Sequence, residues 1–180
     1  NTTRGLFAGG SGAPDGNTMK NIIDYVTIAS VGNATDFGDL TSARRCSNSG
    51  AGSSTRAIFS GGTTPGTSDY VNTIDYVTTA STGNATDFGD LTVARSYGSA
   101  LSSSTRAIYC AGQTPSASNV IDYVTTASTG NATDFGDSTV ARTNMARLSN
   151  SSRGVFASGY VSPGMQNVID YITIGSTGNA

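Results

Sequence analysis

The sequence predicts an all-β protein built from four similar units, and three observations support this. The stretch IDYVTTASTGNATDFGD occurs at positions 74–90 and again, unchanged, at 121–137. Short runs rich in Ile, Val, Tyr and Phe recur in each unit and end at Gly or Pro, as strands do. Charged residues make up only 12% of the chain, so the surface consists largely of Ser, Thr, Asn and Gly. We expect strands near 4–9, 23–28 and 37–43, equivalent strands in later units, and almost no helix.

The spacing of the repeated stretch indicates the architecture. Related copies start at positions 23, 74, 121 and 169, so the spacings are 51, 47 and 48 residues. A period of about 40 to 50 residues is typical of propeller blades rather than of shorter helical solenoids. We therefore expect a single repeat domain over residues 1–180, with units at about 1–44, 45–95, 96–142 and 143–180.

Each unit is predicted to contain four short antiparallel strands. The first follows an Arg, and the second is the IDYVT run, which is partly apolar on both faces. A third strand is expected over 87–94, carrying Phe88, Leu91 and Val93, and a small, polar fourth strand over 96–101. Counted in this way, the first unit lacks its innermost strand and the last its outermost one. We expect an open, incomplete propeller, either a piece of a longer chain or a protomer whose blades another copy completes.

Aromatic residues at equivalent positions are the predicted core. We expect them to be buried between units at equivalent depths, and they are Phe37, Phe88, Phe135, Tyr25, Tyr76, Tyr123 and Tyr171.

The loops that carry the prolines differ most between units. These proline loops cover 11–21, 63–72, 113–119 and 160–167, and each contains one Pro. Antiparallel strands place them on one rim with the Ala-Arg turns, and the STGNAT turns on the opposite rim. Such loops on a rigid support can form a binding site, although drift in unconstrained loops explains the variation equally well. The candidate binding residues are Asp15, Lys20, Asp69, Tyr70, Tyr160, Met165 and Gln166.

The composition argues against an enzyme. The chain contains no His and no Glu, which removes the commonest general base and metal ligand and the Ser-His-Asp arrangement. We expect no catalytic residues and no cofactor. A net charge of −2 without a basic stripe argues against nucleic-acid binding, and no apolar run is long enough to insert into a membrane.

Three further motifs have structural explanations that we prefer. Asp-x-x-Asp pairs at 36/39, 87/90 and 134/137 could bind Ca²⁺, but they lack a calcium-loop pattern, so we expect pairing with Arg residues or capping of turn amides. The glycosylation-type motifs at Asn33, Asn84, Asn131 and Asn150 are interpreted as turns. Cys46 and Cys110 occupy non-equivalent positions and are either free thiols or a single bridge.

The pattern of each unit resembles the kelch repeat. Gly61-Gly62 matches the glycine doublet of that family, Tyr76 the following aromatic residue, and Phe88 the position where Trp is usual. The resemblance implies a kelch-like β-propeller with residues 97–101 innermost in a blade, followed by 107–110, 121–126 and, outermost, 134–140. The chain departs from the family in having Phe for Trp and in the reduced doublets Ala111-Gly112 and Ser158-Gly159.

The tandem STGNATDFGD copies also resemble repeat proteins of marine bacteriophages, including cyanophages, which accompany virion and tail genes. This resemblance implies a non-catalytic structural or host-binding component of a virion, such as a tail fibre, spike or surface appendage. The implied location is the virion or the extracellular space. The implied partners are other virion proteins, copies of the chain itself, or a host surface glycan or receptor. The alternative is a secreted or cell-surface bacterial binding module of lectin type.

Overall fold

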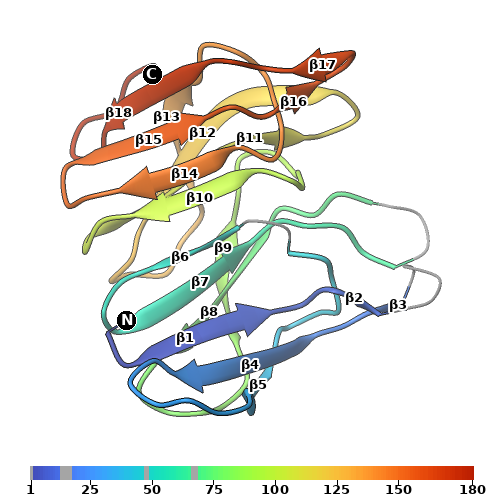
Figure 1. The fold of residues 1–180 in the computed structure, drawn as a ribbon, viewed down its shortest axis with the longest axis vertical. Coiled ribbons are helices and arrows are strands. Elements are labelled where there is room, and N and C mark those ends of the chain that lie inside the picture. Colours follow the sequence, from blue (N-terminus) through green and yellow to red (C-terminus); the bar gives the residue numbers. More distant parts are fainter. Residues whose placement is uncertain (1, 13–17, 47–48, 66–68) are drawn as a thin grey trace.

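The chain forms strands and no helix within the residues that the computed structural model describes, which are 2–12, 18–46, 49–65 and 69–180. The predicted all-β class is therefore confirmed. Each unit contributes one small antiparallel sheet, and the sheets follow one another along the long axis of the molecule (Figure 1).

Two of the four sheets have three strands and two have four. The first contains β1 (Arg4–Ala8), β4 (Ile22–Thr27) and β5 (Thr35–Asp39). The second contains β6 (Gly50–Gly52), β7 (Arg56–Ser60), β8 (Thr73–Thr78) and β9 (Thr86–Asp90). The third contains β10 (Ser99–Ser102), β11 (Arg106–Gln113), β12 (Ala117–Thr125) and β13 (Thr133–Asp137). The fourth contains β14 (Ala146–Ser149), β15 (Arg153–Ala157) and β18 (Ile169–Thr173).

Small hairpins extend two of the proline loops. They are β2 (Ser11–Gly12) with β3 (Thr18–Met19), and β16 (Tyr160–Val161) with β17 (Gly164–Met165). In the third unit the loop is shorter because β11 and β12 continue to pair beyond a bulge near Gly112. Pairing thus continues into the proline loops, whereas we expected proline and glycine to end it.

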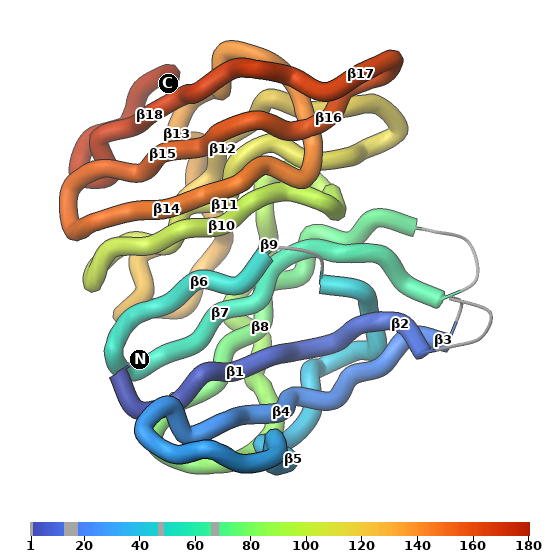
Figure 2. The backbone as a smooth tube through the Cα atoms, viewed as in Figure 1, coloured from blue at the N-terminus to red at the C-terminus, as the bar shows by residue number. Residues whose placement is uncertain are grey.

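The apolar core lies between consecutive sheets. Ile23, Phe37 and Leu40 of the first unit pack with Phe59 and Val77 of the second. Corresponding clusters join the second unit to the third and the third to the fourth. The short strands β6, β10 and β14 lie next to one another, and the backbone passes from one sheet to the next along the stack (Figure 2).

The third strand of each unit is shorter than predicted. It ends at Asp39, Asp90 and Asp137 rather than about four residues later. The Leu91 amide donates to the Asn72 carbonyl, and the chain then turns away to contact the next unit. Leu91 is still buried, but in a turn, while Val93 is partly exposed.

The fourth strand begins later than predicted, at Ser99 rather than near 96. Tyr97 and its equivalent Asn144 both have φ of 54°, which lies in the left-handed region. Such a residue interrupts an extended run, so β10 and β14 start only after it.

The predicted aromatic core is only partly correct. Phe37, Phe88 and Phe135 are each 2% exposed, as predicted, and each contacts the Tyr of its own sheet edge-to-face. The tyrosines Tyr25, Tyr76 and Tyr123 are only half-buried. Tyr171 is 57% exposed, because no described strand lies outside β18 to supply a phenylalanine.

The strand count agrees with the prediction for the end units. Within the described residues, β1 pairs only with β4 and β18 only with β15, so the first and last sheets have three strands each. Phe7 of the first sheet is 63% exposed, whereas its equivalent Phe59 is 6% exposed because the preceding unit covers it.

Candidate functional site

Buried ion pairs join consecutive units. Arg44 follows the third strand of the first unit, and its Nη1 lies 2.8 Å from Oδ2 of Asp75 in the second unit. Arg95 and Asp122 form the same pair between the second and third units, and Arg142 and Asp170 between the third and fourth, each at 2.8 Å. All six side chains are buried.

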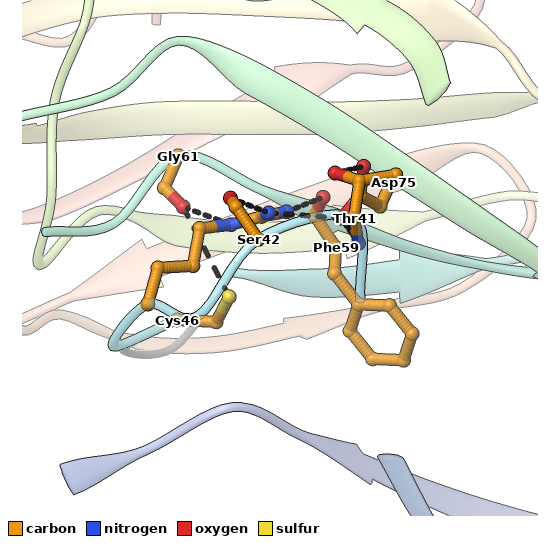
Figure 3. A network of polar contacts seen from close by, with 7 residues as sticks. Thr41, Ser42, Cys46, Phe59, Gly61 and Asp75 are labelled. Atoms are coloured by element: carbon orange, nitrogen blue, oxygen red, sulfur yellow. Dashed lines mark hydrogen bonds and ion pairs between the residues drawn. The ribbon is translucent and has the colours of Figure 1, made fainter. Parts of the chain in front are cut away.

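The first of these pairs is almost completely hydrogen-bonded (Figure 3). Arg44 also donates to the carbonyl oxygens of Gly61 and Phe59 and to the Ser42 hydroxyl, at 3.1, 3.4 and 3.3 Å. Asp75 accepts 3.1 and 2.7 Å hydrogen bonds from the amide and hydroxyl of Thr41. A carboxylate that already accepts from three donors is poorly placed to act as a base or a metal ligand, so this cluster is a structural joint.

These contacts correct our interpretation of the Asp-x-x-Asp pairs. The arginines do form ion pairs, but with the Asp of the IDY run in the following unit rather than with Asp36, Asp39 or their equivalents. The arginines at the start of the first strand of a unit, such as Arg56, contact a tyrosine ring and a backbone carbonyl instead of a carboxylate. Arg56 stacks over Tyr76 with 4.7 Å between its Cζ and the ring centroid, and it donates to the Thr126 carbonyl of the next unit at 3.0 Å.

A second contact between units explains the near-identity of the GNA turns and the TDFGD strands. The Gly83 and Ala85 amides donate 2.7 Å hydrogen bonds to the carbonyl oxygens of Phe37 and Asp39 in the preceding unit. The Asn84 side chain accepts a 3.1 Å hydrogen bond from the Asp39 amide. The same three bonds recur at the next two joints, where Asn131 and Asn179 take the place of Asn84.

The glycine of the TDFGD strand allows the turn of the next unit to approach the strand closely. Gly89 has φ of 143°, and a Cβ placed on it would lie 2.5 Å from the carbonyl group of Gly130. No side chain fits there, so the strand must carry glycine where the turn of the next unit docks. The asparagines of the glycosylation-type motifs are thus turn residues, although at Asn84 and Asn131 the bond crosses to another unit rather than staying local.

The described residues contain no cluster of three or more His, Cys, Asp or Glu side chains that could hold a metal ion.

Both cysteines are free thiols. Burial raises the pKa of the Cys110 thiol from 9.0 to about 12 and also raises the pKa of Cys46. A buried thiol with a raised pKa is a poor nucleophile, so neither cysteine has the environment of a catalytic residue.

The proline loops share one rim with the Ala-Arg turns, as predicted from strand direction. The Arg44 amide donates to the Lys20 carbonyl, and the Arg95 amide to the Val71 carbonyl, both at 3.2 Å. The β2/β3 and β16/β17 hairpins project from the same side of the molecule, near its two ends (Figure 1).

The candidate binding residues do not form a single cluster. Lys20, Asp69 and Tyr70 lie in the loops of the first two units, which touch where the Thr63 hydroxyl meets the Met19 sulfur at 4.0 Å. Tyr160, Met165 and Gln166 belong to the separate hairpin of the fourth unit, where Tyr160 and Met165 are directly paired. Asp15 lies outside the described residues. The rim therefore carries two separate groups of candidate residues, in which Lys20, Asp69, Tyr160 and Met165 are exposed and Tyr70 and Gln166 are half-buried.

A hollow of about 1010 Å³ lies beside β1, and no sequence motif indicated it. Serine-rich turns around Ser53, Ser103 and Ser151 line it, together with Leu6 and Phe7. Arg147 also lines it. Among the described residues this side chain has no hydrogen bond or ion pair, and burial lowers its pKa. The recurring Ser-Ser-Thr-Arg turns were the available signal, but nothing in the sequence indicates that they face a hollow.

The chain matches no protein family model and no curated protein. Among its described residues, no helix has the length and apolarity needed to span a bilayer.

Proposed function

We propose that this chain is a non-catalytic structural and binding component of a phage virion, such as part of a tail fibre, spike or surface appendage. In this role the stacked sheets provide a rigid support, and the proline loops contact a host surface glycan or receptor. Other virion proteins or further copies of the chain hold the support in place.

The observation that carries this proposal is the contrast between the joints and the loops. The same ion pair and the same three hydrogen bonds recur at each of the three joints. The proline loops differ in length and expose large side chains, including Tyr160 and Met165. A uniform support with variable loops is the arrangement that many binding proteins use.

Loop replacement tests this proposal. We would graft the 63–72 loop onto the other three units and measure binding to a glycan array and adsorption to candidate host cells. A second variant, Tyr160→Ala with Met165→Ala, changes exposed residues alone. The matched control is Thr129→Ala, an exposed residue of the turn that precedes β13. We expect the loop variants to lose binding and the control to keep it; unchanged binding of every loop variant would refute the role of the rim.

We further propose that the four sheets are blades of a kelch-like propeller. Two features support this: the four-stranded antiparallel order of the second and third sheets, and the side-by-side position of β6, β10 and β14 at one edge of the stack. Electron microscopy of the assembled protein tests it, because blades radiate from a central axis whereas a linear stack does not.

A lectin-like module of a bacterial surface is the second candidate, and the hollow favours it. Serines of three turns, together with Arg147, line a space large enough for a small saccharide, and polar groups of this kind fix ligand orientation. The variant Arg147→Gln separates the two candidates, because it should weaken glycan binding in the hollow and leave binding at the loop rim unchanged.

A further inference from the structure

A buried tyrosine hydroxyl lies at the joint between the second and third units. Tyr109 of β11 is 3% exposed, and its hydroxyl has no hydrogen-bond partner among the described residues. The equivalent residues of the other units are phenylalanines, namely Phe7, Phe59 and Phe156. A buried hydroxyl without a partner destabilises a folded protein, and such groups are rare in native structures. The third unit therefore carries a polar group that the joint does not require.

A small polar cavity adjoins Tyr109. Its wall includes Ser49 and Ser60 of the second unit and Ser99 of the third, none of which is more than 7% exposed. The space open to the centre of a water molecule is about 10 Å³, which is roughly the least that one water needs. The cavity is thus buried, lined by hydroxyl groups and of single-water size.

The cavity wall offers hydrogen-bond partners. The Ser99 hydroxyl donates to the Met145 carbonyl at 2.8 Å, so its oxygen can still accept. The Ser60 hydroxyl donates to the Ser49 carbonyl at 3.5 Å, which is long for such a bond. Burial raises the pKa of Tyr109, and the nearby Ser60 hydroxyl lowers it, although the two groups do not meet the geometry of a hydrogen bond. One small molecule in the cavity could bind both hydroxyl groups.

The charge around the cavity favours a neutral ligand. Arg95 lines the cavity, but its Nη2 lies 2.8 Å from Oδ2 of Asp122, so its charge is already balanced. Cys110 also lines it, and burial raises the pKa of this thiol to about 12, so the thiol stays protonated at neutral pH. A site of this size and charge suits one water rather than an ion.

We propose that one ordered water occupies this cavity and binds the Tyr109 hydroxyl. The hydroxyl donates to the water, and the water donates to serine oxygens of the wall. The water is then part of the second joint, because it connects β11 of the third unit with Ser49 and Ser60 of the second. Buried waters typically form about three hydrogen bonds and are costly to remove. This site does not depend on what the loop rim binds.

Crystallography of the whole chain tests the proposal directly. We expect one peak of electron density within about 2.5 to 3.2 Å of Oη of Tyr109 and within the same range of a serine oxygen of the wall. The peak should be absent or displaced in crystals of Tyr109→Phe. An empty cavity in the wild-type protein, at a resolution that shows other buried waters, would overturn the proposal.

The direction of a stability change provides an independent test. Tyr109→Phe removes the hydroxyl and keeps the ring, so a hydroxyl bound to water should lose a hydrogen bond. We expect the equilibrium constant for unfolding to rise by about two- to tenfold. Tyr171→Phe, the matched control, removes a hydroxyl from a ring that is 57% exposed and should leave the constant unchanged. A lower constant for Tyr109→Phe would mean that the hydroxyl has no partner, and this result would also overturn the proposal.

Discussion

Nη1 of Arg44 lies 2.8 Å from Oδ2 of Asp75, although the two residues belong to consecutive units and are 31 positions apart in the chain. Neither side chain is exposed to solvent. Charges in such a place are stable only as a pair, because each would otherwise lose its hydration without compensation. The joint between units thus depends on both residues.

We expect Asp75→Ala to lower the free energy of unfolding by about 3 to 5 kcal/mol, because it leaves the Arg44 guanidinium buried and unpaired. Asp24→Ala is the matched control, since it changes the same position of the first unit, where no described arginine pairs with the aspartate; its effect should stay within about 0.5 kcal/mol. Urea denaturation measures both values. Equal losses for the two variants would show that the ion pair does not stabilise the joint.

The phenylalanine core gives a second prediction. Phe88 is buried against its own sheet and the following unit, so Phe88→Ala should cost about 3 to 5 kcal/mol. Phe7→Ala removes the same side chain from an exposed position and should cost less than about 1 kcal/mol. A loss below about 1 kcal/mol for Phe88→Ala in a folded protein would contradict the packing described above.

The thiol of Cys110 should make the protein less stable at alkaline pH. The unfolded thiol ionises near its ordinary pKa of 9.0, whereas burial raises the pKa in the folded protein to about 12. Between these values the unfolded state loses a proton that the folded state keeps, so the free energy of unfolding should fall as pH rises, by at most about 1.4 kcal/mol per pH unit.

The variant Cys110→Ala isolates this contribution. Its free energy of unfolding should decline less steeply between pH 9 and 12 than that of the wild type. Tyr109, whose pKa is also raised by burial, contributes to both proteins alike. Identical slopes would show that the thiol titrates as in the unfolded chain.

The first residue of each glycine doublet provides a backbone prediction. Gly61, Ala111 and Ser158 have φ of 59°, 58° and 59°, so the turn requires the left-handed conformation whatever residue is present. That conformation costs a residue with a Cβ about 1 to 2 kcal/mol. We expect Ser158→Gly to raise the melting temperature and Gly61→Ala to lower it, as calorimetry would measure. If the melting temperature fell for Ser158→Gly and rose for Gly61→Ala, side-chain contacts rather than backbone conformation would determine stability at these positions.

Much of the fold could be predicted from the sequence because equivalent positions of the repeats form equivalent strands. The strands at the IDYVT runs and the burial of Phe37, Phe88 and Phe135 were predictable. The end of the third strand was not, because Leu91 continues the apolar alternation although its backbone has already turned toward the next unit. Alternation indicates which side chains are buried, but a buried residue can lie in a turn.

The partners of the charged residues were less predictable. Among the described residues, Asp75, Asp122 and Asp170 of the IDY runs form ion pairs with arginines, whereas the two Asp of each TDFGD strand form none. Which aspartate meets the arginine depends on how one sheet packs against the next, and no local sequence pattern encodes that packing. The hollow was missed for the same reason, since its walls come from β1 and from turns of three other units.

In the part of the chain that the structure describes, the joints link each sheet to the sheets next to it, and this determines how the molecule unfolds. Within the described residues, the second and third sheets have joints on two sides, whereas the sheets of β1 and β18 have a joint on one. Unfolding should therefore proceed from the ends, with the amides of β8, β9, β11 and β12 exchanging hydrogen most slowly. Thermal damage to such a protein would begin as fraying at its two ends while the middle units kept their shape.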